Sequence, residues 1–234
     1  MHSATITADG QRHEAHYRPG TSDKRVIQQI IIERDYDLRA STRYGEIVEF
    51  LERQRRSGLH PLIVDAGANI GISSLYFSLV FAGAVVVAIE PEPANFALLQ
   101  RNVAGRDVDC VRAALASSEG AARIVDPGEG AWGFRAERDV AGDVPCVSVD
   151  MIYRQYRRDD LCPFLVKIDI EGGEDEVFRA NTEWLAETPL VIIELHDWLL
   201  PGRGTSGSFL RAVAEADRDF VPLGENILSI RHRL

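Results

Sequence analysis

Acidic side chains and one histidine gather in two short stretches of the second half of the sequence. Asp169 and Glu171 directly follow one apolar run, and Glu194 and His196 close the next. Each run has the length and composition of a buried strand. If the two strands are parallel neighbours, their carboxyl ends meet at one edge of a sheet, and the four side chains lie together there. Carboxylates and an imidazole at such an edge can accept a proton or bind a metal ion.

A second set of residues with chemical potential lies between Leu62 and Gly71. The stretch begins as an apolar strand that ends in Asp65, and Gly67 and Gly71 then open a helix with apolar residues at helical spacing. A strand, a glycine turn and a helix N-terminus form the crevice in which open α/β sheets bind nucleotides. Glycine lets the backbone approach the ligand, and the free amides of the first helical turn point into the crevice.

The residues of this turn select among nucleotides. A dinucleotide site needs glycine in place of Asn69 and Ile72, and a phosphate-binding P-loop needs a lysine that the turn lacks. The acid at its start suits the ammonium group of an amino acid, and the backbone amides suit a carboxylate. S-adenosylmethionine (SAM) carries both groups together with a ribose. The next strand ends in Glu90, which can accept hydrogen bonds from both ribose hydroxyls.

Four blocks of sequence carry these residues in a fixed order. They are Asp65-Ala-Gly-Ala-Asn-Ile-Gly71, Glu90-Pro91, Lys167-Ile-Asp169-Ile-Glu171-Gly172 and Ile193-Glu194-Leu-His196. Together they resemble the FkbM family of SAM-dependent methyltransferases, over most of the chain. The resemblance implies an α/β fold of the Rossmann-like class I methyltransferase type. It also implies sugars, glycosylated lipids or polyketide-type natural products as methyl acceptors.

The cofactor site predicted on this basis draws on the first three blocks and on one residue outside them. Ala114 follows the third predicted strand, where the fold resembled places its adenine contacts. The predicted SAM-binding residues are Asp65, Gly67, Asn69, Gly71, Glu90, Pro91, Ala114 and Asp169.

Catalytic roles for the acidic stretches stay open on the sequence alone. Asp169 is a candidate for holding the methionyl end of SAM or the acceptor hydroxyl. Glu171 and His196 are candidate general bases, because histidine titrates near neutrality and burial can raise the pKa of a glutamate. The alternative for His196 is a structural bond to a backbone carbonyl. Asp169, Glu171 and Glu194 as Mg²⁺ ligands rank lower, because no ligand spacing demands a metal.

The remaining sequence supplies the elements that position these residues. Strands are predicted at 62–65, 84–90, 109–112, 164–168 and 190–195, and helices at 71–81, 93–103, 150–157, 173–185 and 209–216. Two further strands, near 220–223 and 227–231, close the domain. Strands that alternate with helices through short loops predict a doubly wound, mostly parallel sheet.

Two regions depart from this alternation. Residues 1–60 are predicted as an N-terminal helical cap, and residues 61–234 as the SAM-binding methyltransferase domain. The N-terminal region holds a possible hairpin around Asp9-Gly10 and two helices, and it either caps the cofactor cleft or merely covers a sheet edge. The stretch 120–149 predicts an exposed insertion of short strands, in which Trp132 either faces the substrate or packs locally.

Composition and charge exclude several other classes. The chain has 234 residues, of which 45% are hydrophobic and 26% charged, as expected for one globular α/β domain. A net charge of −10 argues against non-specific nucleic acid binding. Neither a secretory signal nor a membrane span is expected, since polar residues and glycines interrupt the long charge-free stretch 66–89. Three cysteines without metal-like spacing favour a reduced, cytoplasmic protein.

These features predict an enzyme that transfers a methyl group from SAM to a hydroxyl of a small molecule. One rival is methyl transfer to nitrogen, a reaction that favours an aromatic-walled pocket. The sequence has no Asn/Asp-Pro-Pro-aromatic block, which is usual for that reaction. A second is a module that binds SAM without catalysis. An NAD-dependent oxidoreductase is disfavoured by the glycine turn. The acceptor and the oligomeric state are not set by the sequence.

Overall fold

A seven-stranded sheet forms the centre of the computed structural model, which describes residues 1–126, 128 and 133–234. Its strand order is β12-β13-β11-β10-β3-β4-β5. The parallel strands are β3 (His60–Ala66), β4 (Val85–Ile89), β5 (Val108–Val111), β10 (Leu161–Ile168) and β11 (Leu190–Glu194). The last hairpin, β12 (Arg218–Leu223) and β13 (Asn226–Arg231), extends the sheet with β13 antiparallel to β11. The predicted mostly parallel sheet is confirmed.

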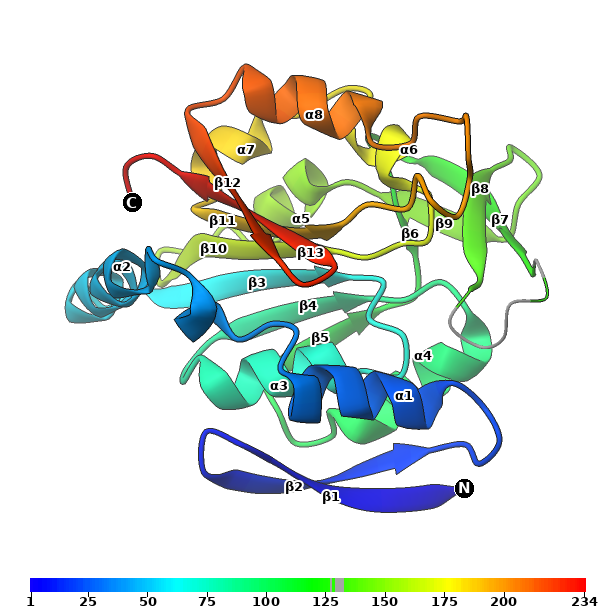
Figure 1. Ribbon diagram of the computed structural model, residues 1–234, viewed down its shortest axis with the longest axis horizontal. Helices are drawn as coiled ribbons and strands as arrows, with labels where there is room; N and C mark the ends of the chain where they lie inside the picture. The colour runs from blue at the N-terminus through cyan, green and yellow to red at the C-terminus, as the bar shows by residue number, and fades with distance from the viewer. Residues whose placement is uncertain (127, 129–132) are drawn as a thin grey trace.

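Helices cover both faces of this sheet (Figure 1). One face packs against α3 (Ile72–Val80) and α4 (Pro93–Asn102), and α2 (Tyr44–Arg56) contributes to the same core. The other face packs against α5 (Val149–Gln155), α6 (Glu174–Phe178), α7 (Trp184–Glu187) and α8 (Gly207–Ala214). Successive strand residues face opposite layers, so Ile63 joins the first core while Leu62 and Val64 join the second. This doubly wound arrangement explains why the strands read as continuous apolar runs.

The predicted N-terminal region contains a hairpin as well as helices. Strands β1 (His2–Ala8) and β2 (Gln11–Tyr17) are joined through Asp9 and Gly10, whose φ angles of 46° and 75° suit a two-residue hairpin turn. In Figure 1 the hairpin lies beneath α3 and α4, on the side away from the sheet. Next come α1 (Asp23–Ile27), the π-helix η1 (Gln28–Glu33) and the 3₁₀-helix η2 (Leu38–Ala40).

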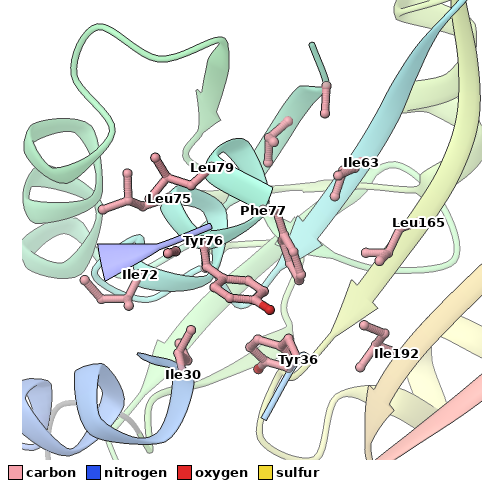
Figure 2. Close-up of a cluster of buried hydrophobic side chains, with 14 of the residues drawn as sticks. Ile30, Tyr36, Ile63, Ile72, Leu75, Tyr76, Phe77, Leu79, Leu165 and Ile192 are labelled. Atoms are coloured by element: carbon pink, nitrogen blue, oxygen red, sulfur yellow. The ribbon is translucent and has the colours of Figure 1, made fainter. Parts of the chain in front are cut away.

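Side chains fix this N-terminal region to the main domain. Figure 2 shows Ile30 and Tyr36 inside the core beside α3, and the ring of Tyr36 lies 5.5 Å from that of Phe77. The buried Asn102 of α4 accepts a hydrogen bond from the amide of His16 at 2.7 Å, and its amide group donates to the carbonyl of Ile70 at 2.7 Å. The region is therefore bonded to the glycine turn as well as packed on the helices.

The predicted insertion, 120–149, forms a second, four-stranded sheet together with the short strand β6 that precedes it. Its strand order is β6-β9-β7-β8, where β6 is Ala114–Leu115, β7 is Gly120–Val125, β8 is Arg135–Arg138 and β9 is Val144–Val147. Arg138 on β8 connects this sheet to the main domain by an ion pair of 2.8 Å with Glu176. Trp132, for which two roles were predicted, lies outside the described residues.

One predicted helix is wrong. Residues 173–185 do not form a continuous helix, because the chain turns between α6 and α7. Asn181 adopts a left-handed φ of 56°, and its side-chain amide donates to the carbonyl of Ser117 at 2.9 Å. Among the described residues, no helix is both long and apolar enough to cross a membrane.

Candidate active site

A cavity of about 590 Å³ lies at the carboxyl ends of the parallel strands. Residues that follow β3, β4, β5, β10 and β11 line it, which is where open α/β sheets bind ligands. Its volume falls in the usual range for small-molecule sites. The N-terminal region and the second sheet complete the wall, through Arg25, Val26, Gln29, Ile30, Asp35, Tyr36, Phe134, Ala136, Arg138 and Cys146.

The glycine turn after β3 lies against the end of β10. Gly67 has a φ of 72°, and a Cβ atom there would lie 1.7 Å from the backbone oxygen of Asp169. Only glycine fits this contact, which places the turn beside the first residue of the acidic stretch. Asn69 also adopts a left-handed φ, of 50°, and lines the cavity.

Glu90 lies at the end of β4 with both carboxylate oxygens held by the backbone. Oε2 accepts a hydrogen bond from the amide of Asn69 at 2.8 Å, and Oε1 accepts one from the amide of Glu92 at 2.9 Å. Burial raises the pKa of this carboxyl to about 7, although both amides act in the opposite direction. The side chain of Asn95 also hydrogen-bonds this carboxyl, and the remaining acceptor capacity of Glu90 faces the cavity.

A row of small residues forms the neighbouring wall. Ala113, Ala114, Leu115 and Ala116 follow β5, and all four line the cavity. Ala114 was predicted to border an adenine. Pro91, predicted from its place beside Glu90, lines the cavity too. The wall is apolar and lets a flat ring approach closely.

Two predicted cofactor-binding residues lie behind the turn and do not line the cavity. The carboxylate of Asp65 is fully buried and accepts hydrogen bonds from the hydroxyls of Ser73 at 2.6 Å and Ser74 at 2.5 Å. A Cβ atom on Gly71 would lie 2.6 Å from Cδ1 of Leu99, so glycine there lets α3 pack on α4. In the structure the two residues support the turn, and their contact with a ligand stays a prediction.

Lys167 lines the cavity, although its sequence block predicted no role for it. Its buried ammonium donates to the carbonyl of Gly67 at 2.8 Å and pairs with Asp65 at 3.3 Å and Asp169 at 3.4 Å. Burial lowers its pKa, but Tyr36 and the two carboxylates together raise it above the usual lysine value. The ammonium therefore stays charged and ties the glycine turn to the end of β10. The sequence contains one signal for such a role, which is a lysine within an otherwise apolar strand.

The predicted acidic residues meet around His196. Its Nδ1 hydrogen-bonds Oε1 of Glu174 at 2.6 Å. Its Nε2 lies 3.5 Å from Oε2 of Glu171 and Oε1 of Glu194, and 3.8 Å from Oδ1 of Asp169. We call Asp169, Glu171, Glu194 and His196 the acid cluster. The three carboxylates line the cavity, whereas the imidazole lies buried behind them.

Burial and mutual repulsion govern the electrostatics of the acid cluster. Burial, followed by the charge of Asp169, raises the pKa of Glu171 to about 7. Burial lowers the pKa of His196, but its hydrogen bonds with Glu174 and Glu194 prevail and raise it to about 11. In the free protein the imidazole is thus protonated on both nitrogens and positively charged, which disfavours it as the general base. Glu171 also has a left-handed φ of 53°, a strained conformation for a residue with a side chain.

Other cavity residues had no signal in the local sequence. Tyr36 is fully buried beside Lys167, and its hydroxyl lies 3.5 Å from Asp169. Asn226 pairs with Glu194 across β13 and β11, so the two side chains share one face of the sheet. Trp198 lines the cavity while 68% of its surface is exposed. Their places depend on tertiary packing, which spacing along the chain does not reveal.

Curated relatives match short parts of the chain. Methyltransferase sdnD of Sordaria araneosa is 43% identical over 65 residues, which are 26% of this chain and 25% of that protein. Methyltransferase 1 of Beauveria bassiana (strain ARSEF 2860) is 43% identical over 51 residues, 22% of this chain and 20% of that protein. The chain thus spans a quarter or less of the length of these relatives.

Solved structures resemble the chain more broadly but more distantly. A putative rRNA methylase from Clostridium thermocellum covers 78% of this chain and 96% of its own, with 9% identity and a TM-score of 0.45. A variant of MtNAS in complex with S-adenosylmethionine covers 83% of this chain and 65% of its own, with 15% identity and a TM-score of 0.37. Likenesses at this level assign neither a substrate nor a cofactor.

A family model gives the decisive match. The methyltransferase FkbM domain matches residues 65–221, well over half of the chain. The match begins at the glycine turn and includes Glu90 and the whole acid cluster. The chain therefore belongs to the methyltransferase FkbM domain family.

Proposed function

We propose that the protein is a SAM-dependent methyltransferase that methylates a hydroxyl group of a small molecule. One observation carries this proposal: a single cavity joins a carboxylate held by two backbone amides, Glu90, to the acid cluster. The first end suits a ribose and the second suits a group that must lose a proton. The net charge of −10 and the carboxylates of the wall favour a small acceptor over a nucleic acid.

The residues at the Glu90 end fit SAM. Glu90 would accept hydrogen bonds from both ribose hydroxyls, and Ala114 with its neighbours would border the adenine. Gly67 and Asn69 would present the turn to the amino acid end, near Asp169. When bound, SAM supplies an electrophilic methyl group on a sulfonium.

The acid cluster then lies where the acceptor must bind. A hydroxyl that accepts a methyl group has to lose its proton, and a positioned carboxylate that takes up this proton contributes typically 10²–10⁴-fold to the rate. Oε2 of Glu171 and Oε1 of Glu194 both belong to carboxylates that line the cavity. Alignment of the hydroxyl with the methyl group supplies several kcal/mol more. Methyl transfer to nitrogen does not need this cluster of acceptors.

Calorimetry with SAM tests the cofactor assignment. Glu90→Ala leaves two ribose hydroxyls unpaired, which should weaken SAM binding about tenfold or more. Glu52→Ala, an exposed change on α2, is the matched control and should bind SAM as the unaltered protein does. Equal SAM affinity in the two variants would refute the role of Glu90.

Turnover tests the reaction. The protein should transfer the methyl group of isotope-labelled SAM to members of a panel of hydroxylated metabolites, with the product identified by mass. The same compounds with the hydroxyl already methylated should not react. Transfer to amines alone would support the nitrogen alternative, and SAM binding without transfer to either class would point to a binding module.

A further inference from the structure

The acid cluster has the donor set of a metal site. The ligand atoms of Asp169, Glu171 and His196 all lie within 4.8 Å of one another. In an octahedral site with bonds of about 2.1 Å, adjacent ligand atoms lie about 3.0 Å apart and opposite ones about 4.2 Å apart. The distances of 3.5 Å and 3.8 Å from Nε2 of His196 to its neighbours fall between these values. Small side-chain shifts would therefore complete the geometry.

Glu174 prepares the imidazole for this role. Its Oε1 lies 2.6 Å from Nδ1 of His196, and the whole side chain of Glu174 is buried. A carboxylate on one ring nitrogen, with the other nitrogen facing the ligand, is the usual outer arrangement of a metal-binding histidine. A metal ion would take the place of the proton on Nε2, while the ring would keep its proton on Nδ1 for Glu174.

The charges of the acid cluster call for a cation. Three carboxylates surround Nε2, and Glu174 adds a fourth on the far side of the ring. The protonated His196 supplies one positive charge, and Lys167 reaches only Asp169 among these carboxylates while it also pairs with Asp65. Two positive groups thus face more carboxylates than they can neutralise. Carboxylates brought together in a partly buried site repel one another unless a positive charge offsets them.

A separate observation points to the same place. Asn226 is only 4% exposed and lines the cavity, yet its Oδ1 has no hydrogen-bond partner among the described residues. It pairs with Glu194 across β13 and β11 and lies on the same face of the sheet. An unsatisfied buried carbonyl oxygen is costly, and amide oxygens are ligands for hard cations.

We propose that Asp169, Glu171 and His196 bind a divalent metal ion, with Glu194 and Asn226 at its border. Carboxylates with one imidazole and an amide oxygen favour Mn²⁺ or Mg²⁺ over metals that prefer sulfur or several imidazoles. The role of the ion rests on the proposed function. On the side that faces the cavity, the ion would hold the hydroxyl of the methyl acceptor. Acceptors with two neighbouring oxygens would bind best, since both could reach the ion.

Mn²⁺ binding to the protein without SAM or acceptor tests the site directly. Paramagnetic resonance of free Mn²⁺ should show one ion bound per chain. Glu171→Gln should weaken this binding at least tenfold, and His196→Gln should do the same. Asp35→Asn and Glu225→Gln are the matched controls, because both residues are acidic and line the cavity outside the acid cluster. They should leave Mn²⁺ binding unchanged.

Two results would overturn the proposal. The first is no binding of Mn²⁺ at millimolar concentration, and the second is equal weakening by the control variants, which would indicate diffuse acidity. SAM affinity of the same samples separates this outcome from the proposed function. Normal SAM binding without Mn²⁺ binding refutes the metal site alone, whereas loss of SAM binding with intact Mn²⁺ binding refutes the cofactor assignment.

Discussion

The two ends of the cavity differ in how their polar groups are satisfied. At the Glu90 end, backbone amides occupy one position on each carboxylate oxygen. At the other end, Nε2 of His196 faces three carboxylates at 3.5 to 3.8 Å, and Glu171 holds a left-handed backbone conformation. The carboxylate at the first end is held by the backbone before a ligand arrives. The second end stores repulsion and strain that a ligand can relieve.

This difference suggests a division of labour. An end that is already satisfied binds one invariant molecule with little rearrangement, as a cofactor site should. An end that carries unbalanced charge responds strongly to what binds there, as an acceptor site should. Lys167 and Gly67 lie where the two ends meet, so changes there should damage both. Changes at one end alone should affect either SAM binding or the reaction with the acceptor, but not both.

Removal of the lysine ammonium should have the largest effect. Lys167→Met leaves the carboxylates of Asp65 and Asp169 without their cation and should lower the free energy of unfolding by about 3–5 kcal/mol. Urea denaturation measures this change. Lys24→Met alters the only other lysine, which is exposed on α1, and should change stability by less than about 0.5 kcal/mol. Similar losses in both variants would show that the buried pairs contribute nothing.

Gly67→Ala should come next, at about 3 kcal/mol. The new methyl group would overlap the backbone oxygen of Asp169, and the positive φ adds about 1 kcal/mol of strain. Gly105→Ala isolates the second effect, since Gly105 has a φ of 76° and no neighbour within 4 Å. Thermal unfolding of both variants, with SAM titration of each, measures the difference. If the two lose equal stability, the close approach of the turn to β10 is not maintained in solution.

A change confined to the acid cluster should slow methyl transfer without weakening SAM binding. Glu171→Gln should slow methyl transfer roughly 10²-fold, because it removes a charge at the acceptor, while SAM affinity stays within about twofold. Glu137→Gln on the exposed surface of β8 should leave both quantities unchanged. Single-turnover rates and calorimetry provide the two readouts. A parallel loss of SAM affinity would mean that the two ends are not separable.

A change of pH should have the smallest effect on SAM binding, and it should act on that binding through Glu90. The pKa of Glu90 in the free protein is about 7, and ribose hydroxyls donate to its ionised form. SAM affinity should therefore rise as the pH increases through 7, by about tenfold between pH 6 and pH 8. Binding at pH 6 should release a proton, which calorimetry in buffers of different ionisation enthalpy detects. Glu90→Gln should bind more weakly and show little dependence on pH in this range.

The sequence predicts the Glu90 end better than the acid cluster for a physical reason. The turn from Gly67 to Gly71 and the acid after β4 are local features, in which a strand end and a positive φ select the residue type. The carboxylate of Asp65 bonds to hydroxyls in the first turn of α3 and does not line the cavity, a choice that spacing does not reveal. Asn181 likewise interrupts a helix by bonding to distant Ser117. Tyr36 and Asn226 reach the cavity only through packing.

Asn102 couples the stability of the N-terminal hairpin to that of the glycine turn. Its side chain bonds to both the amide and the carbonyl of His16 and to the carbonyl of Ile70, so opening of the hairpin removes two of the three bonds that hold this amide against the turn. Hairpin and turn should therefore open together as one cooperative unit, and their amides should exchange hydrogen at similar rates. Occupancy of the cavity would then slow exchange in strands that touch no ligand. A chain trimmed to residues 65–221 would lose this brace on its own turn.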